Sequence, residues 1–235
     1  MMTLLQVQGI ETHIGQFHIL QGVTFEVKAG EITVVLGRNG AGKTTALRSI
    51  MGLNPVSRGE IRFQGERIEA LPTHRIARQG IGYVPEDQGI FPELTVGETM
   101  RIAMRRNDAE TKARLEWALE LFPDLRAFWG RKSGLLSGGQ KQMLAISRAY
   151  VNDNRLLLID EPSKGLAPIM VEKLMQAIEQ MKAKTTVLLV EQNFMMASRI
   201  GDRYVLMDEG RIVAAGTMAE LRQDEATRRK YLGIA

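Results

Sequence analysis

The chain has 235 residues, of which 44% are hydrophobic, and this length is sufficient for one large domain with a full hydrophobic core. The absence of cysteine excludes disulfides and thiolate metal sites, and the net charge of +4 is too small and too scattered to indicate a nucleic-acid partner. No apolar stretch approaches the roughly 20 residues that cross a bilayer, and residues 1–7 lack the features of a signal peptide. We therefore expect a single domain over residues 1–235 that stays in the cytoplasm.

The first part of the chain is typical of β-structure that leads into a helix. Between Leu4 and Leu36, short β-rich runs are interrupted by turn residues, which predicts antiparallel strands that end in a buried strand over 32–36. A second hairpin is predicted over 61–68. A short helix over 71–79 and a strand over 81–84 follow.

The residues after the buried strand match the phosphate-binding pattern G-x-x-x-x-G-K-[ST] without a mismatch: Gly37, Arg38, Asn39, Gly40, Ala41, Gly42, Lys43, Thr44 and Thr45. The match lies where a strand turns into a helix, as such a loop requires, whereas an ordinary glycine-rich loop fits the pattern in about one chain in a hundred of this length. We expect the loop amides and the ammonium of Lys43 to bind the phosphates of a nucleoside triphosphate. The hydroxyl of Thr44 is the candidate ligand for Mg²⁺.

The middle of the chain is predicted to be largely helical. A capping box, Thr95-Val96-Gly97-Glu98, opens an amphipathic stretch through Arg106. A second helix is predicted over 109–122, with Pro123 ending it, and a third over about 138–150.

The last part of the chain alternates between strands and helices. Buried strands are predicted over 156–159 and 186–190, with a helix over 168–181 between them, and this order implies a parallel sheet. A hairpin over 204–214 and a C-terminal helix are predicted after them.

Two acidic residues, Asp160 and Glu161, follow the apolar strand 156–159 directly. Acids at the end of a buried strand are costly unless they serve cations or reactants. Asp160 is therefore the candidate to hold Mg²⁺ through water, and Glu161 is the candidate to polarise the attacking water in phosphoryl transfer. The structural alternative is an acid pair that caps the helix following Pro162. The phosphate loop upstream favours the catalytic interpretation.

The run Leu136-Ser137-Gly138-Gly139-Gln140 lies between the phosphate loop and Asp160. In sequence, order and spacing it resembles the signature motif LSGGQ of the ATP-binding cassette (ABC) proteins, and the resemblance covers essentially the whole chain. It implies an α/β fold with a P-loop NTPase (RecA-like) core and parallel sheet, an N-terminal antiparallel β-subdomain and an inserted α-helical subdomain over approximately 88–150. It also implies that ATP and Mg²⁺ are bound, and that Ser137, Gly138, Gly139 and Gln140 contact ATP held by a second cassette. Locally, the same residues are also an ordinary helix N-cap followed by flexible glycines.

Three positions near the expected active site differ from the usual cassette pattern. Glu86 stands where the Q-loop carries glutamine, which changes the local charge near Mg²⁺. Gln192 stands at the switch position that normally carries histidine, and a neutral amide cannot gain a proton. Ala167 replaces the usual D-loop aspartate, so that one polar contact across a cassette dimer is expected to be missing.

The adenine side of the site differs as well, because Ile14 stands where an aromatic residue usually stacks on the base. Phe17 and His13 are the candidate substitutes. Phe17 is equally compatible with a core position.

Glu86, Ala167 and Gln192 lie in the runs VPE (84–86), GLAP (165–168) and VEQN (190–193). This combination of runs resembles the ATPases of branched-chain amino acid importers. In that subgroup the chain resembles the second of two non-identical cassettes, which implies a heterodimer beneath two membrane permeases that a periplasmic binding protein supplies. It would then lie peripherally on the inner face of the cell membrane. A closely similar subgroup serves the uptake of urea and short-chain amides, and this substrate class stays open.

Two other functional classes are compatible with the cassette motifs. A DNA or ribosome factor built on the same cassette is disfavoured, because the chain has no long coiled-coil insertion, no cysteine zinc site and no second cassette. A nucleotide-binding partner that hydrolyses ATP poorly is suggested by Gln192, Glu86 and Ala167. Glu161 argues against complete inactivity.

Overall fold

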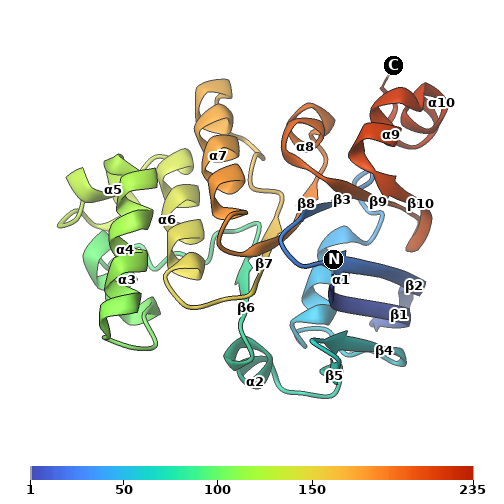
Figure 1. The fold of residues 1–235 in the computed structure, drawn as a ribbon, viewed down its shortest axis with the longest axis horizontal. Helices are drawn as coiled ribbons and strands as arrows, with labels where there is room; N and C mark the ends of the chain where they lie inside the picture. Colours follow the sequence, from blue (N-terminus) through green and yellow to red (C-terminus); the bar gives the residue numbers. More distant parts are fainter. Residues whose placement is uncertain (1, 235) are drawn as a thin grey trace.

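The computed structural model describes residues 2–234, and its strands form two sheets (Figure 1). The smaller sheet is antiparallel and has the strand order β2-β1-β4-β5. It consists of β1 (Thr3–Ile14), β2 (Phe17–Lys28), β4 (Arg58–Phe63) and β5 (Glu66–Arg67). The two hairpins that the sequence predicts in this region are therefore confirmed.

The larger sheet has the order β10-β9-β3-β8-β7-β6, and its five strands from β9 to β6 run parallel. β10 pairs with β9 in an antiparallel hairpin. The strands are β3 (Ile32–Leu36), β6 (Ile81–Val84), β7 (Leu156–Asp160), β8 (Thr186–Glu191), β9 (Arg203–Asp208) and β10 (Arg211–Thr217). Every residue of β3, β7 and β8 is buried, which is why these strands read as continuous apolar runs.

Alternate residues of the central strands serve two separate hydrophobic cores. On β3, Val34 faces one core and Val35 the other, and on β8 the same holds for Leu189 and Leu188. One core lies between the two sheets and includes the apolar face of α1 (Lys43–Ile50). The other core lies on the opposite face of the larger sheet and includes apolar residues of α7 (Pro168–Met181) and α8 (Phe194–Ile200).

Four further helices lie together on the side of the larger sheet that ends in β6 (Figure 1). They are α3 (Val96–Ala103), α4 (Ala109–Leu121), α5 (Pro123–Ala127) and α6 (Gly138–Tyr150), with a 3-10 turn over Ser133–Leu135. The capping box predicted at Thr95 is present. Pro123 ends α4 as predicted, but it also opens α5, because its fixed φ and missing N–H suit the first position of a helix.

The remaining helices are short. In the sequence, α2 (Thr73–Arg78) stands between β5 and β6. After β10 come α9 (Met218–Gln223), α10 (Glu225–Thr227) and a π-helical turn (Arg228–Leu232). Across residues 2–234, none of the helices combines the length and the apolarity that crossing a membrane requires. The sequence analysis missed α8, because seven residues are too few to show a clear helical period.

Candidate nucleotide-binding and hydrolysis site

The parallel sheet gathers three functional segments at one edge, because the carboxyl ends of β3, β7 and β8 point the same way. The glycine-rich loop follows β3, the acid pair stands at the end of β7, and Glu191 ends β8. Neighbouring strands therefore place Lys43, the acid pair and Glu191 at the same edge of the sheet.

The loop between β3 and α1 is shaped by close packing at its glycines. A Cβ atom on Gly37 would lie 2.4 Å from the carbonyl oxygen of Met207, and one on Gly42 would lie 3.1 Å from a methyl group of Leu20. Gly42 also has a φ of 100°, which other residues rarely adopt. The pattern therefore requires glycine at both positions for reasons of space as well as conformation.

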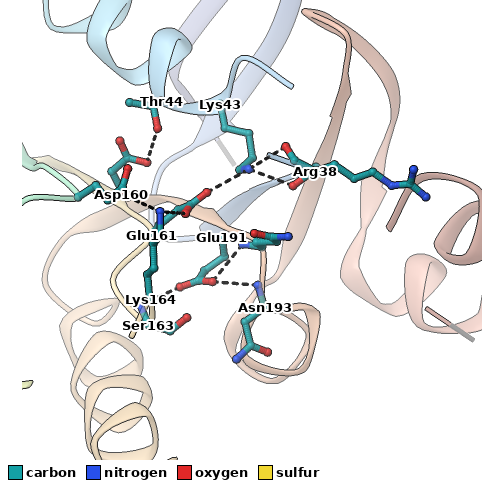
Figure 2. Close-up of polar contacts among 12 residues, drawn as sticks. Arg38, Lys43, Thr44, Asp160, Glu161, Ser163, Lys164, Glu191 and Asn193 are labelled. Atoms are coloured by element: carbon teal, nitrogen blue, oxygen red, sulfur yellow. Dashed lines mark hydrogen bonds and ion pairs between the residues drawn. The ribbon is translucent and has the colours of Figure 1, made fainter. Parts of the chain in front are cut away.

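Lys43 is the first residue of α1, and its side chain turns back into the loop (Figure 2). Its Nζ donates to the carbonyl oxygens of Gly37 and Arg38 at 3.0 and 3.1 Å. The same nitrogen lies 3.1 Å from Oε1 of Glu161. Lys43 is only 4% exposed, so this carboxylate and the two carbonyls compensate its buried charge.

Thr44 and Asp160 form the part of the site that fits a divalent cation. The hydroxyl of Thr44 donates to Oδ1 of Asp160 at 3.1 Å (Figure 2). Oδ2 of Asp160 is buried and has no hydrogen-bond partner among residues 2–234. Burial is the main cause that raises the pKa of Asp160 to about 6. A buried, unpartnered carboxylate oxygen beside a threonine hydroxyl is a donor set that suits Mg²⁺, so the residues fit the predicted ion.

Glu161 stands directly after β7 with a φ of 42°, an unusual value for a residue with a side chain. Its N–H donates to the carbonyl oxygen of Val190 at 2.9 Å, which holds this backbone in place. The side chain is 9% exposed and points at Lys43. Strained backbone that the surrounding structure holds in place is typical of functional sites.

Glu191 is a residue of the site to which the sequence analysis assigned no role. Its Oε1 accepts the N–H of Ser163 at 3.0 Å, and its Oε2 accepts the N–H groups of Gln192 and Asn193 at 3.1 and 3.0 Å. Burial raises the pKa of Glu191. A second acid at the end of a buried strand was the available signal, because its burial requires partners of this kind.

The three replaced positions have different surroundings. Glu86 lies at the site, but its Oε1 contacts Nζ of Lys164 at 2.5 Å. Gln192 is exposed beside the buried Glu191. Ala167 is an exposed N-cap of α7 without a side-chain hydrogen bond.

A cavity of about 300 Å³ lies over the phosphate loop. It is lined by Ile19, Asn39, Gly40, Gly42, Lys43, Thr44, Thr45, Glu86, Glu161 and Lys164. The structure thus brings the loop, the catalytic candidate and the Q-loop position together around one space.

The signature residues lie elsewhere in the described chain, since none of residues 137–140 lines this cavity. Ser137 caps α6 and forms a capping box with Gln140. A Cβ atom on Gly139 would lie 2.5 Å from the side chain of Met170, whereas Gly138 is exposed with open space before it. The N-terminus of α6 is therefore displayed on the surface.

The residues predicted to lie on the adenine side are found at the tip of the β1–β2 hairpin. Ile14 pairs with Phe17 across the turn, and both side chains are exposed. The rings of His13 and His18 stack next to them at 4.2 Å. Phe17 is therefore a surface residue and not a core residue.

Several proteins of known family align with most of this chain. The branched-chain amino acid transport ATP-binding protein BraG of Pseudomonas aeruginosa is 40% identical, and the alignment covers 98% of this chain and 100% of BraG. The probable branched-chain amino acid transport ATP-binding protein LivF of Archaeoglobus fulgidus is 41% identical, over 93% of this chain and 94% of LivF. The lipopolysaccharide export system ATP-binding protein LptB of Escherichia coli is 34% identical, over 92% and 91%.

Solved structures agree with the architecture. An ATP-binding subunit of an ABC transporter has a TM-score of 0.84 and 32% identity, over 98% of this chain and 96% of its own. A bacterial ABC transporter cassette in a dimeric structure has a TM-score of 0.81 and 25% identity, over 92% and 99%. These likenesses confirm the predicted fold class. The sequence profile of the ABC transporter family matches residues 20–164, and this chain therefore belongs to that family, whose ATP-binding cassettes hydrolyse ATP to drive transport.

Proposed function

We propose that this chain is the ATP-hydrolysing subunit of an importer for branched-chain amino acids. The observation that supports hydrolysis is that Lys43, Thr44 and Glu161 line one cavity, while Asp160 accepts a hydrogen bond from Thr44 beside it. The likeness to BraG and LivF supports branched-chain amino acids as the substrate class. Import is the direction that the sequence resemblance to the importer subgroup implies.

In this proposal, the residues at the carboxyl ends of β3, β7 and β8 have separate tasks. The loop amides and Lys43 bind the phosphates of ATP. Thr44 and, through water, Asp160 hold Mg²⁺, which neutralises charge on the phosphates when it is bound. Glu161 accepts a hydrogen bond from the attacking water and orients it towards the terminal phosphorus. Glu191 keeps the segments after β7 and β8 in register while this happens.

The site is completed by a second cassette. Ser137, Gly138, Gly139 and Gln140 form the N-terminus of α6, where backbone N–H groups and the helix dipole favour an anion. They do not line this chain's own cavity, which supports contact with the nucleotide of a partner. The dimeric structure of a similar cassette supports a dimer here. We propose a partner that is a non-identical cassette.

Closure of such a pair would depend on ATP, because the terminal phosphate contacts the partner's signature only in the closed state. A ligand that binds one state better shifts the population towards it, and hydrolysis removes the shift. Through this cycle ATP turnover would drive movement of the permeases.

The path to the permeases is proposed to run through the segment 88–95. Arg148 of α6 donates to the carbonyl oxygens of Gly89 and Gln88 at 2.5 and 2.9 Å, which couples this segment to the helix that begins with the signature. Phe91 is exposed in the same segment and offers apolar surface to a partner. We propose residues 88–150 as a helical subdomain that moves as a unit. Two membrane permeases would contact it, and a periplasmic binding protein would deliver the substrate.

An export function is the second candidate, because LptB also matches over most of the chain. Uptake of urea or short-chain amides is the third. The test deletes the gene for this chain in its source cell and measures the uptake of radiolabelled leucine and of radiolabelled urea. The deletion strain is then complemented with the wild-type chain or with Glu161→Gln. Restored leucine uptake by the wild type alone supports the proposal. Normal leucine uptake without the chain would refute it.

A further inference from the structure

Lys164 occupies a place in the cavity to which the proposed function assigns no task. It lies in the turn after β7, where its N–H donates to the carbonyl oxygen of Glu161 at 3.2 Å. Its Nζ lies 2.5 Å from Oε1 of Glu86 and 3.9 Å from Oε2 of Glu161. Figure 2 shows Lys164 beside Glu161 on the side away from Lys43.

The four side chains form a line of alternating charge across the cavity. Lys43 pairs with Oε1 of Glu161, Lys164 approaches Oε2 of the same carboxylate, and Glu86 holds the far side of Lys164. Each oxygen of Glu161 therefore faces a different ammonium group. The two distances at Lys164 show that its ammonium is bound by Glu86 and only approaches Glu161.

This line joins two parts of the chain that are far apart in the sequence. Glu86 follows β6 and stands just before the segment 88–95, whereas Lys164 and Glu161 follow β7. The hydrogen bond to Glu86 raises the pKa of Lys164. Both side chains are exposed, and Lys164 lies within reach of both carboxylates, so that a small shift of Glu86 would change which carboxylate Lys164 contacts.

We propose that Lys164 is a positioning residue that Glu86 holds away from Glu161, and that release by Glu86 lets Lys164 pair with Glu161 and slow hydrolysis. The physical reason is competition for one carboxylate. An ammonium bound to Oε2 would compete with the attacking water for its acceptor and would weaken the carboxylate as a base. Movement of the segment 88–95 could therefore switch turnover through the position of Glu86.

This inference rests on the proposed role of Glu161 as the residue that orients the water. The test measures steady-state ATPase rates of the full chain with its partner cassette for Glu86→Gln, Lys164→Met and the double variant. Glu86→Gln is expected to lower kcat about fivefold with little change in KM, a factor that corresponds to about 1 kcal/mol. In the Lys164→Met background, the same change at Glu86 is expected to alter kcat by less than about twofold.

The matched control is Glu172→Gln, which breaks another exposed ion pair, with Arg199, away from the cavity. It is expected to retain the wild-type kcat. Thermal unfolding of every variant establishes that the fold is intact, as expected for substitutions of exposed side chains.

Three results would overturn the inference. The first is a wild-type kcat in Glu86→Gln. The second is an equal loss in both backgrounds, which would mean that Glu86 acts without Lys164. The third is a change in the Mg²⁺ dependence that Lys164→Met does not remove, which would assign Glu86 to the metal. If Glu161→Gln itself retains full turnover, the proposed function of Glu161 fails instead, so the two failures are distinguishable.

Discussion

Glu191 and Ser163 are joined by a hydrogen bond in which Oε1 of the buried glutamate accepts the backbone N–H at 3.0 Å. The other oxygen of Glu191 accepts the N–H groups of Gln192 and Asn193. Ser163 lies two residues after Glu161 in the chain. One carboxylate, 1% exposed, thus fixes the backbone beyond both β7 and β8 and keeps the switch position next to the proposed catalytic residue.

Replacing this carboxylate should loosen both segments. Glu191→Gln is expected to lower the free energy of unfolding by about 1–2 kcal/mol, because an amide has one acceptor atom where the carboxylate has two. It is also expected to lower kcat for ATP more than it changes KM. Urea denaturation and steady-state ATPase rates measure the two effects. Equal behaviour of Glu191→Gln and the exposed variant Glu172→Gln would contradict the prediction.

Lys43 should be required for binding of the nucleotide. Lys43→Ala is expected to weaken ATP binding at least about tenfold, because one charge-assisted hydrogen bond to a phosphate contributes about 1.5–3 kcal/mol. Isothermal titration measures the dissociation constant, and circular dichroism checks the fold, since Glu161 loses its counter-charge. Lys112→Ala, at an exposed position of α4, is the control. Unchanged ATP affinity in Lys43→Ala would show that the loop binds phosphate without its lysine.

When no metal is bound, the charged form of Asp160 should lower the free energy of unfolding at pH values above the pKa of this carboxyl group. In the folded chain burial raises the pKa of this carboxyl from 3.8 to about 6, so the protonated form is favoured by folding. Stability is therefore lost as the pH rises from about 4 to about 6. At pH 8, Asp160→Asn is expected to raise the free energy of unfolding by about 2–3 kcal/mol, and at pH 4 the gain should vanish.

Urea denaturation without Mg²⁺ at several pH values tests this expectation. Asp153→Asn is the control, because Asp153 is exposed and its pair with Arg114 lies on the surface. A destabilised Asp160→Asn at pH 8 would show that the buried charge is compensated.

Gly138 should affect the binding of ATP by the partner cassette and not the binding of ATP by this chain. A Cβ atom at this exposed position would meet no atom within 4 Å, so Gly138→Glu is expected to fold normally. The added carboxylate would repel a phosphate of the partner, and the ATPase rate of the cassette pair is expected to fall at least about tenfold. ATP affinity of the isolated chain should stay within about twofold. Gly130→Glu, which also points into open space, is the control. Full ATPase activity of Gly138→Glu would argue against a composite site.

Much of this architecture could be read from local patterns. The period of 168–181, the apolar runs of the central strands, the capping box at Thr95 and the N-cap at Ser137 each depend on residues close in the chain. The sequence analysis missed α8 and the second helix that starts at Pro123, because short helices depend on packing more than on periodicity.

The sequence alone determined the family, the phosphate loop and the acid pair, because these follow from residue types at fixed spacing. Only the tertiary structure decided which side chains meet: Lys43 with Glu161, Thr44 with Asp160, and Lys164 with Glu86. It also revealed that Phe17 is exposed and that Glu191 bridges two strand ends. The physical reason is that these contacts join segments up to 118 positions apart, whose proximity depends on the order of strands in the sheet and not on any local pattern.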